Sequence, residues 1–98
     1  MWILETAEAD DRVLRFRLSP GAIKTIGRAA RADFLLDRAL VSRLHCRVTA
    51  GPDALEVEDL ASTNGTFVND KRIDRAVVAS GDRLRIGRVE LKVERATN

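Results

Sequence analysis

Three polar segments of the sequence combine residue types that could bind an oxyanion. The first is Gly27-Arg28, the second is residues 42–45 (Ser-Arg-Leu-His), and the third is residues 59–66 (Asp-Leu-Ala-Ser-Thr-Asn-Gly-Thr). A phosphate ester carries about 1.5 to 2 negative charges near neutral pH and presents three strong acceptor oxygens. One forked guanidinium, two hydroxyls and a backbone N–H would satisfy those oxygens. The segments could therefore bind a phosphorylated ligand, provided that the fold brings them together.

The same segments also contain the residue types of a hydrolase triad, namely Ser42, His45 and Asp59. Geometry defines a triad, however, and the sequence shows neither a nucleophile elbow nor a candidate oxyanion hole. A domain of this size also leaves little room for a substrate pocket. We therefore expect that the chain is not an enzyme.

The elements that must position the polar segments are strands, because apolar and polar residues alternate with a period of two. Turn signals such as Ser19-Pro20-Gly21 and Asn64-Gly65 separate the alternating runs. Short strands with frequent turns predict an all-β sandwich or barrel, and residues 28–40 could add one helical turn. The predicted strands are 2–6, 12–18, 23–27, 34–36, 45–50, 54–58, 66–68, 71–73, 76–79, 83–86 and 89–94.

The composition is that of one ordinary globular domain, spanning residues 1–98. A single cysteine excludes an internal disulfide and, with one histidine, disfavours a zinc site, so we expect a reducing, cytoplasmic location without metal or cofactor. No apolar run approaches the roughly 20 residues of a membrane-spanning helix. We also expect Cys46 to face the core, because it continues the apolar positions of an alternating strand.

A nucleic-acid-binding domain is the alternative suggested by the arginine content. The 17 basic residues are balanced by 15 acidic ones, and the chain has only four aromatic residues, three Phe and one Trp. Binding of single strands needs exposed aromatic platforms, whereas we expect Trp2, Phe16, Phe34 and Phe67 to pack in the core. The sequence therefore favours neither nucleic acid nor membrane as a partner.

Taken in order and spacing, the three segments resemble the forkhead-associated (FHA) family, whose members are phosphothreonine-binding β-sandwiches. The family pattern of Gly-Arg, Ser-x-x-His and Asn-Gly is matched by Gly27-Arg28, residues 42–45 and Asn64-Gly65. Residues 81–87 are similar to the last hairpin of the family, and Asp70 stands where the family often has Gly. The resemblance covers nearly the whole chain.

The resemblance implies a two-sheet β-sandwich of about eleven short, mostly antiparallel strands, with the binding loops at one end. The phosphate ligands that it implies are Arg28, Ser42, Arg43 and Thr63. It implies further that Asn64 holds the backbone of the bound peptide. The residues that it implies as structural support for the site are Gly27, His45, Gly65 and Asn69.

On this basis we expect a monomeric adaptor that binds phosphothreonine-containing segments of partner proteins, downstream of a Ser/Thr kinase. The alternative on the same fold is a phosphate-independent protein-interaction scaffold, since a fold does not dictate a function. The preference next to the phosphothreonine stays open. Leu40 and Val41 favour an apolar neighbour, and a set of basic residues favours an acidic one: Arg31, Arg38, Lys71 and Arg72.

Overall fold

Alternating burial along short strands builds the molecule. The computed structural model describes residues 1–7 and 13–96. Within them lie eleven β-strands: β1 (Trp2–Thr6), β2 (Arg15–Leu18), β3 (Ile23–Gly27), β4 (Phe34–Leu35), β5 (Cys46–Ala50), β6 (Leu55–Asp59), β7 (Thr66–Val68), β8 (Lys71–Ile73), β9 (Arg75–Val78), β10 (Arg83–Ile86) and β11 (Val89–Arg95). In β5, and in β11 as far as Val93, every second residue is buried, as expected for strands with one face in the core.

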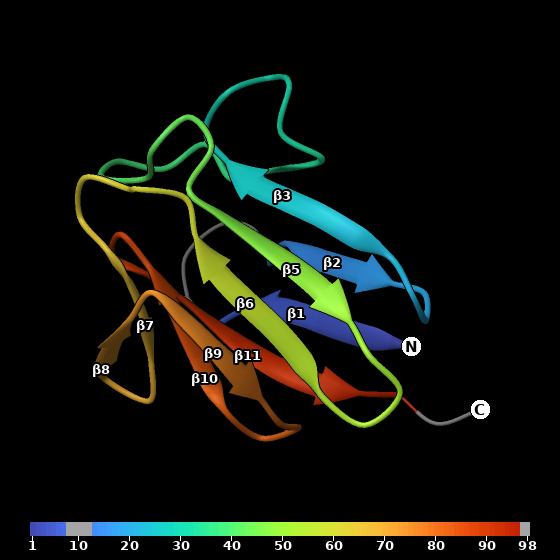
Figure 1. The fold of residues 1–98 in the computed structure, drawn as a ribbon. Coiled ribbons are helices and arrows are strands. Elements are labelled where there is room, and N and C mark those ends of the chain that lie inside the picture. The colour runs from blue at the N-terminus through green and yellow to red at the C-terminus, as the bar shows by residue number, and fades with distance from the viewer. Residues whose placement is uncertain (8–12, 97–98) are drawn as a thin grey trace.

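The strands form two sheets that pack face to face (Figure 1). One sheet has the order β2-β1-β11-β10-β7-β8 and the other has the order β4-β3-β5-β6-β9. All pairings are antiparallel except that of β3 with β4. The predicted all-β sandwich is therefore confirmed.

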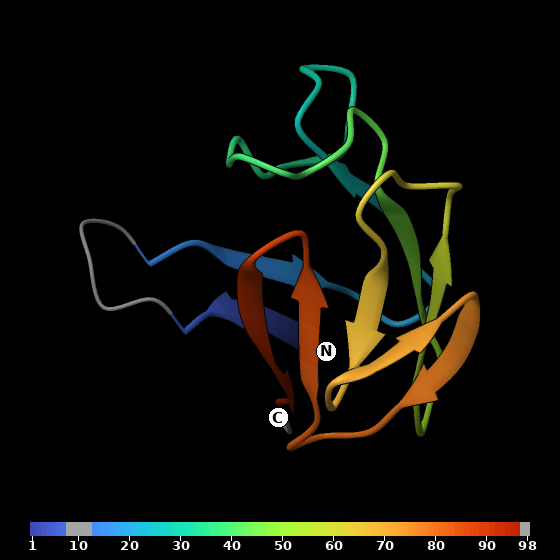
Figure 2. The same ribbon diagram turned by 90° about the vertical axis from the view of Figure 1, so that its left-hand side faces the viewer.

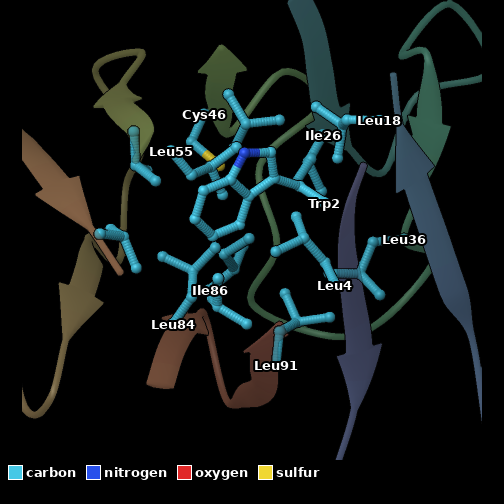
Figure 3. Close-up of a cluster of buried hydrophobic side chains, with 14 of the residues drawn as sticks. Trp2, Leu4, Leu18, Ile26, Leu36, Cys46, Leu55, Leu84, Ile86 and Leu91 are labelled. Carbon is cyan, nitrogen blue, oxygen red and sulfur yellow. The ribbon is translucent and has the colours of Figure 1, made fainter. Parts of the chain in front are cut away.

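The core lies between the sheets and is centred on the indole of Trp2 (Figure 3). Leu4, Leu84 and Leu91 of the six-stranded sheet face Ile26 and other fully buried side chains of the five-stranded sheet. The indole Nε1 donates to the carbonyl of Gly51 (3.0 Å), so the one polar atom of this ring is satisfied.

Cys46 is fully buried, which confirms that it faces the core. Burial raises the pKa of its thiol, because desolvation disfavours the thiolate and the charge of Asp59 acts in the same direction. The thiol is therefore an inert packing group.

Ten predicted strands agree with the structure to within one residue at each end, and one does not. The strand predicted over residues 12–18 begins at Arg15, while residue 12 lies outside the described residues. The N–H of Leu14 donates to the hydroxyl of Thr6 (2.9 Å) instead of to a strand carbonyl, which interrupts the ladder. The possible helical turn over residues 28–40 is also absent. Two separate turns take its place, one closed by Ala32 N–H donating to the Ala29 carbonyl (2.9 Å) and one by Val41 N–H donating to the Arg38 carbonyl (3.3 Å).

The prediction that Phe67 packs in the core is wrong. Its neighbours Thr66 (fully buried) and Val68 face inward, so Phe67 lies on the outer face of the six-stranded sheet, half-buried. The guanidinium of Arg85 covers its ring at 4.0 Å from the centroid. Phe16 and Phe34, by contrast, stack on each other beside the core, with centroids 4.7 Å apart.

Candidate functional site

The three polar segments meet at one end of the sandwich, in the loops that follow β3, precede β5 and follow β6 (Figures 1 and 2). The backbone N–H of Arg28 donates to the carbonyl of Ser42 (3.0 Å), and the N–H of Ala29 donates to that of Arg43 (3.1 Å). Backbone hydrogen bonds thus join the first two segments directly.

Gly27 makes this junction possible because the second segment lies directly against its Cα. A Cβ at position 27 would lie 2.0 Å from the carbonyl oxygen of Arg43 and 2.9 Å from the Cα of Leu44. No side chain fits at such distances from backbone atoms, so any other residue would push the two loops apart.

The guanidinium of Arg28 is held at one nitrogen and open at the other two. Its Nε donates to the carbonyl of Val41 (3.0 Å), while the terminal nitrogens have no acceptor among the described residues. The side chain is exposed at the end of β3. Its fork is therefore oriented in advance and free to donate to an oxyanion.

Ser42 and Thr63 bring two hydroxyls to the same place. The N–H of Thr63 donates to Oγ of Ser42 (3.1 Å), so this oxygen acts as an acceptor and its own proton can be donated elsewhere. The hydroxyl of Thr63 is exposed, and no described residue bonds to it. Two hydroxyl donors thus adjoin the loop that carries Arg28.

Asn64 ties the third segment to the loop before Ser42. Its Nδ2 donates to the carbonyl of Leu40 (3.0 Å), and its Oδ1 accepts from no described residue. Leu40 adopts a φ of +70°, which few leucines do, and the backbone of Gly87 packs against its carbonyl. A Cβ on Gly87 would lie 2.7 Å from that oxygen, so the turn between β10 and β11 helps to hold the loop.

His45 is buried beneath the loops in a single tautomer. The backbone N–H of Ser42 donates to its Nδ1 (3.0 Å), so the ring proton lies on Nε2 and is donated to the carbonyl of Gly65 (2.8 Å). Burial lowers the pKa of His45, although the Gly65 carbonyl and the charge of Asp59 oppose the shift. The neutral ring therefore links the second segment to the third.

Asp59 organises the third segment through one carboxylate. Its oxygens accept from the N–H of Ser62 (3.0 Å), the hydroxyl of Ser62 (2.6 Å) and the hydroxyl of Thr66 (2.7 Å). Burial alone would raise the pKa of Asp59, but these hydrogen bonds outweigh burial and hold that pKa below its usual value. The hydroxyl of Ser62 in turn accepts from the N–H of Gly65 (3.0 Å), which closes the loop.

These contacts exclude the hydrolase triad. His45 accepts from the backbone N–H of Ser42 rather than from its hydroxyl, and its other nitrogen donates to a carbonyl. The carboxylate of Asp59 is occupied by Ser62 and Thr66. No base among the described residues is placed to activate the Ser42 hydroxyl.

Two of the residues named from the sequence have side chains that bond to no residue of this cluster. The backbone of Arg43 packs on Gly27, but its side chain is exposed and bonds to no described residue. Asn69 follows the far end of β7 and bonds to the turn before β10: its Oδ1 accepts from the N–H of Arg83 (2.9 Å) and its Nδ2 donates to Asp82 (3.1 Å). Asn69 therefore fixes the opposite end of the sandwich.

Sequence reasoning missed the carbonyls of Leu40 and Val41, which orient Asn64 and Arg28. These are backbone atoms, so residue type carries no signal for them. It also left Asp59, Ser62 and Thr66 out of the site, although all three stand within the third segment. An acidic residue followed by hydroxyl residues at i+3 and i+7 in a loop was the available signal.

Comparison with known proteins now identifies the fold family. The sequence model of the FHA domain matches residues 24–87, which include every residue of the cluster described above. The chain belongs to the FHA family. Its forkhead-associated character, expected from three short motifs, is thereby confirmed.

Two curated relatives of this FHA domain are named as a regulator and an inhibitor. Glycogen accumulation regulator GarA of Mycobacterium tuberculosis is 40% identical over 70 residues, or 71% of this chain and 43% of that protein. The oxoglutarate dehydrogenase inhibitor of Corynebacterium diphtheriae is 39% identical over 67 residues, or 68% of this chain and 47% of that protein. The chain spans less than half the length of these relatives. The family that the comparison shows is the FHA domain, which is not an enzyme family.

Solved FHA domains superpose on nearly the whole chain. The FhaA FHA domain complexed with the intracellular domain of Rv3910 has a TM-score of 0.83 at 32% identity, covering 96% of this chain and 100% of that one. A domain from a study of phosphothreonine-dependent FHA domain interactions has a TM-score of 0.84 at 31% identity, covering 99% and 98%. The FHA domain of CT664 from Chlamydia trachomatis, at 0.91 and 21% identity over 98% of each chain, supports the fold alone.

The described residues offer no helix that is long and apolar enough to cross a membrane.

Proposed function

We propose that this FHA domain binds phosphothreonine-containing segments of partner proteins and so acts as an adaptor downstream of a Ser/Thr kinase. The observation that carries the proposal is the guanidinium of Arg28, which the Val41 carbonyl orients while its terminal nitrogens stay open. The adjoining hydroxyls of Ser42 and Thr63 add two donors. Together they match the acceptor oxygens of a phosphate, with Arg43 close enough to add its backbone N–H or side chain.

Asn64 supplies the contact that an extended peptide needs beside the phosphate. Its Nδ2 is bound to Leu40, which fixes the plane of the amide, and its Oδ1 is left to accept a backbone N–H of the peptide. Gly27, His45 and Gly65 hold the loops around this contact. One fixed phosphate and one backbone clamp would set the register of the bound segment.

The relatives support the same function. A domain of 31% identity was described for phosphothreonine-dependent interactions, and the EmbR protein of Mycobacterium tuberculosis, at 28% identity and a TM-score of 0.82, was solved with a phosphopeptide. We extend this ligand class to the present chain and propose a single domain acting as a monomer in the cytoplasm, where Ser/Thr kinases and a reduced Cys46 are compatible. Nucleic acid, membrane and cofactors have no part in the proposal.

The test is a calorimetric titration with peptides of one backbone that carry phosphothreonine, phosphoserine, glutamate or threonine. We expect saturable binding of the phosphothreonine peptide only. Glutamate presents one charge on a planar group and should fail, and phosphoserine should bind about tenfold or more weakly because it lacks the methyl group. Equal binding of the threonine peptide would replace our proposal with the phosphate-independent scaffold.

A further inference from the structure

A cationic row crosses the outer face of the six-stranded sheet beside the proposed phosphopeptide site. Arg72 on β8 and Arg85 on β10 are the register partners of Phe67 on β7, so the three side chains lie side by side on one face. The guanidinium carbon of Arg85 lies 4.0 Å from the ring centroid of Phe67. The aromatic ring thus has an arginine on each neighbouring strand. We call these three residues the Arg72–Phe67–Arg85 row.

The row reaches the binding loops because position 65 has no side chain. A Cβ on Gly65 would lie 2.9 Å from Nε of Arg72 and 3.2 Å from Cε1 of Phe67. The guanidinium of Arg72 therefore lies over the backbone of Gly65, the residue that follows Asn64. A peptide held by Asn64 would pass beside this cation as it leaves the site.

The charges of the row are not neutralised within the part of the chain that the structure describes. Arg72 and Arg85 have no carboxylate partner there. Glu90, the register neighbour of Arg85 on β11, lies 3.8 Å from the guanidinium of Arg83 instead.

Two other arginines of the same sheet do have partners, for Arg15 pairs with Glu5 and Arg83 with Asp70 at 3.2 Å. Thus the two arginines of the row, in the part of this face that adjoins the loops, form no ion pair among the described residues.

We propose that the Arg72–Phe67–Arg85 row selects phosphopeptides that carry Asp or Glu on the flank that runs beyond Asn64. This inference rests on the proposed function, because the phosphothreonine must anchor the peptide first. Phe67 holds Arg85 through its ring and thereby limits the freedom that this guanidinium loses on binding. The acidic side chain would accept from the guanidinium of Arg72, with Arg85 adding to the local potential.

The test compares phosphothreonine peptides in which one neutral position at a time, on either side of the phosphothreonine, is replaced by Asp. We expect one flank alone to respond, with affinity rising about 1.5- to fivefold, the range of an exposed ion pair. Arg72→Gln should abolish that gain and leave the affinity for the neutral peptide unchanged. Arg17→Gln is the matched control, because Arg17 is another exposed arginine of this sheet and lies on β2, at the opposite edge from β8.

The outcomes separate the two proposals. If no phosphothreonine peptide binds, the proposed function fails and the inference fails with it. If the neutral phosphopeptide binds but Asp gives no gain, or the gain survives Arg72→Gln, the inference alone is overturned. A preference for an apolar flank that ignores Arg72 would likewise overturn it and assign selection to the exposed side chain of Leu40. A gain shared by both flanks and reduced equally by Arg17→Gln would show only general attraction, which also contradicts the row.

Discussion

The two ends of the sandwich use polar side chains in opposite ways. At the end that holds the turn after β7, both side-chain polar atoms of Asn69 and both carboxylate oxygens of Asp82 are bonded to one another or to the backbone of Arg83 and Ala79. At the other end, the guanidinium of Arg28 donates from one of its three nitrogens, and the remaining two bond to no described residue.

The same partial use recurs in the other residues of the loop end. Asn64 uses its amide nitrogen and leaves its oxygen open, and Ser42 accepts a hydrogen bond while keeping its own proton. Bonds within the protein therefore orient these groups without saturating them. A closed turn stabilises only the fold, whereas half-used groups held in place stabilise the fold and can still bind a ligand.

The largest loss of stability that we predict comes from adding a side chain at position 27, where the binding loops pack closely. Gly27→Ala places a Cβ against the Arg43 carbonyl and should cost about 3 kcal/mol or more. Gly81→Ala is the control at the other end, since position 81 has a φ of +96° but open space, and it should cost about 1 to 2 kcal/mol. Urea unfolding measures both. A Gly27 variant no less stable than the Gly81 variant would contradict the close packing of the loops.

Removing the Asp59 carboxylate, which organises the third segment, should give the second largest loss of stability. Asp59→Ala leaves Ser62 and Thr66 without their acceptor and should cost about 2 to 3 kcal/mol. Asp59→Asn keeps one acceptor oxygen and should lose less. Phosphopeptide affinity should fall in the same order, because Thr63 and Asn64 belong to this loop. An Asp59→Ala protein with unchanged urea midpoint would refute the role of the carboxylate.

Protonation of His45 at low pH should destabilise the end of the sandwich that carries the binding loops. The pKa of His45 is lowered in the fold, so its stabilisation is complete above its ordinary pKa of about 6.5 and is lost as pH falls through the lower folded pKa. A proton on Nδ1 would face the Ser42 N–H. Urea unfolding without peptide should therefore show falling stability on acidification below about pH 6.5.

The control for the pH experiment is His45→Gln. His45 is the only histidine in the chain, so this variant should lose that dependence and keep only the loss at lower pH, where Asp59 titrates. An identical pH profile in the two proteins would show that the buried ring does not titrate with folding.

The smallest effect on stability and binding is predicted for Asn69, in the turn after β7. Asn69→Ala removes two hydrogen bonds and places alanine at a φ of +48°, which should cost about 1 to 2 kcal/mol of stability. Phosphopeptide affinity should not change, because Asn69 lies away from the loops. A loss of affinity greater than the loss of stability would place Asn69 in the site after all.

Much of the fold could be predicted from the sequence, because strands with one buried face leave a period of two. The face of the sheet on which a residue lies was harder to predict where its hydrophobicity and its position in the strand disagree. In β7 an aromatic residue faces outward and Thr66 faces inward. The Thr66 hydroxyl donates to Asp59, and Thr66 is paired in register with the buried Ile86 of β10. Hydrophobicity alone predicts the reverse for Phe67.

The candidate site was predictable where side chains carry it. Arg28, Ser42, Thr63 and Asn64 come together as their motifs indicate. The sequence could not indicate the left-handed φ of Leu40, which aims a carbonyl at Asn64. The strand β7 has only three residues, at about 3.3 Å each. The sequence could not show that this short strand places Asn69 at the end of the sandwich opposite the binding loops.

The central claim is that an oriented and half-used Arg28 binds the phosphate, and affinity in Arg28→Ala tests it most directly. Calorimetric titration with a phosphothreonine peptide should show a loss of about 100-fold or more, with only a small fall in melting temperature from the lost hydrogen bond to the Val41 carbonyl. Arg28→Lys should also weaken binding, because a point charge lacks the fork, whereas Arg17→Ala should bind as the wild type does. If Arg28→Ala binds the peptide as tightly as Arg17→Ala, the phosphate is not held at this site and the account is wrong.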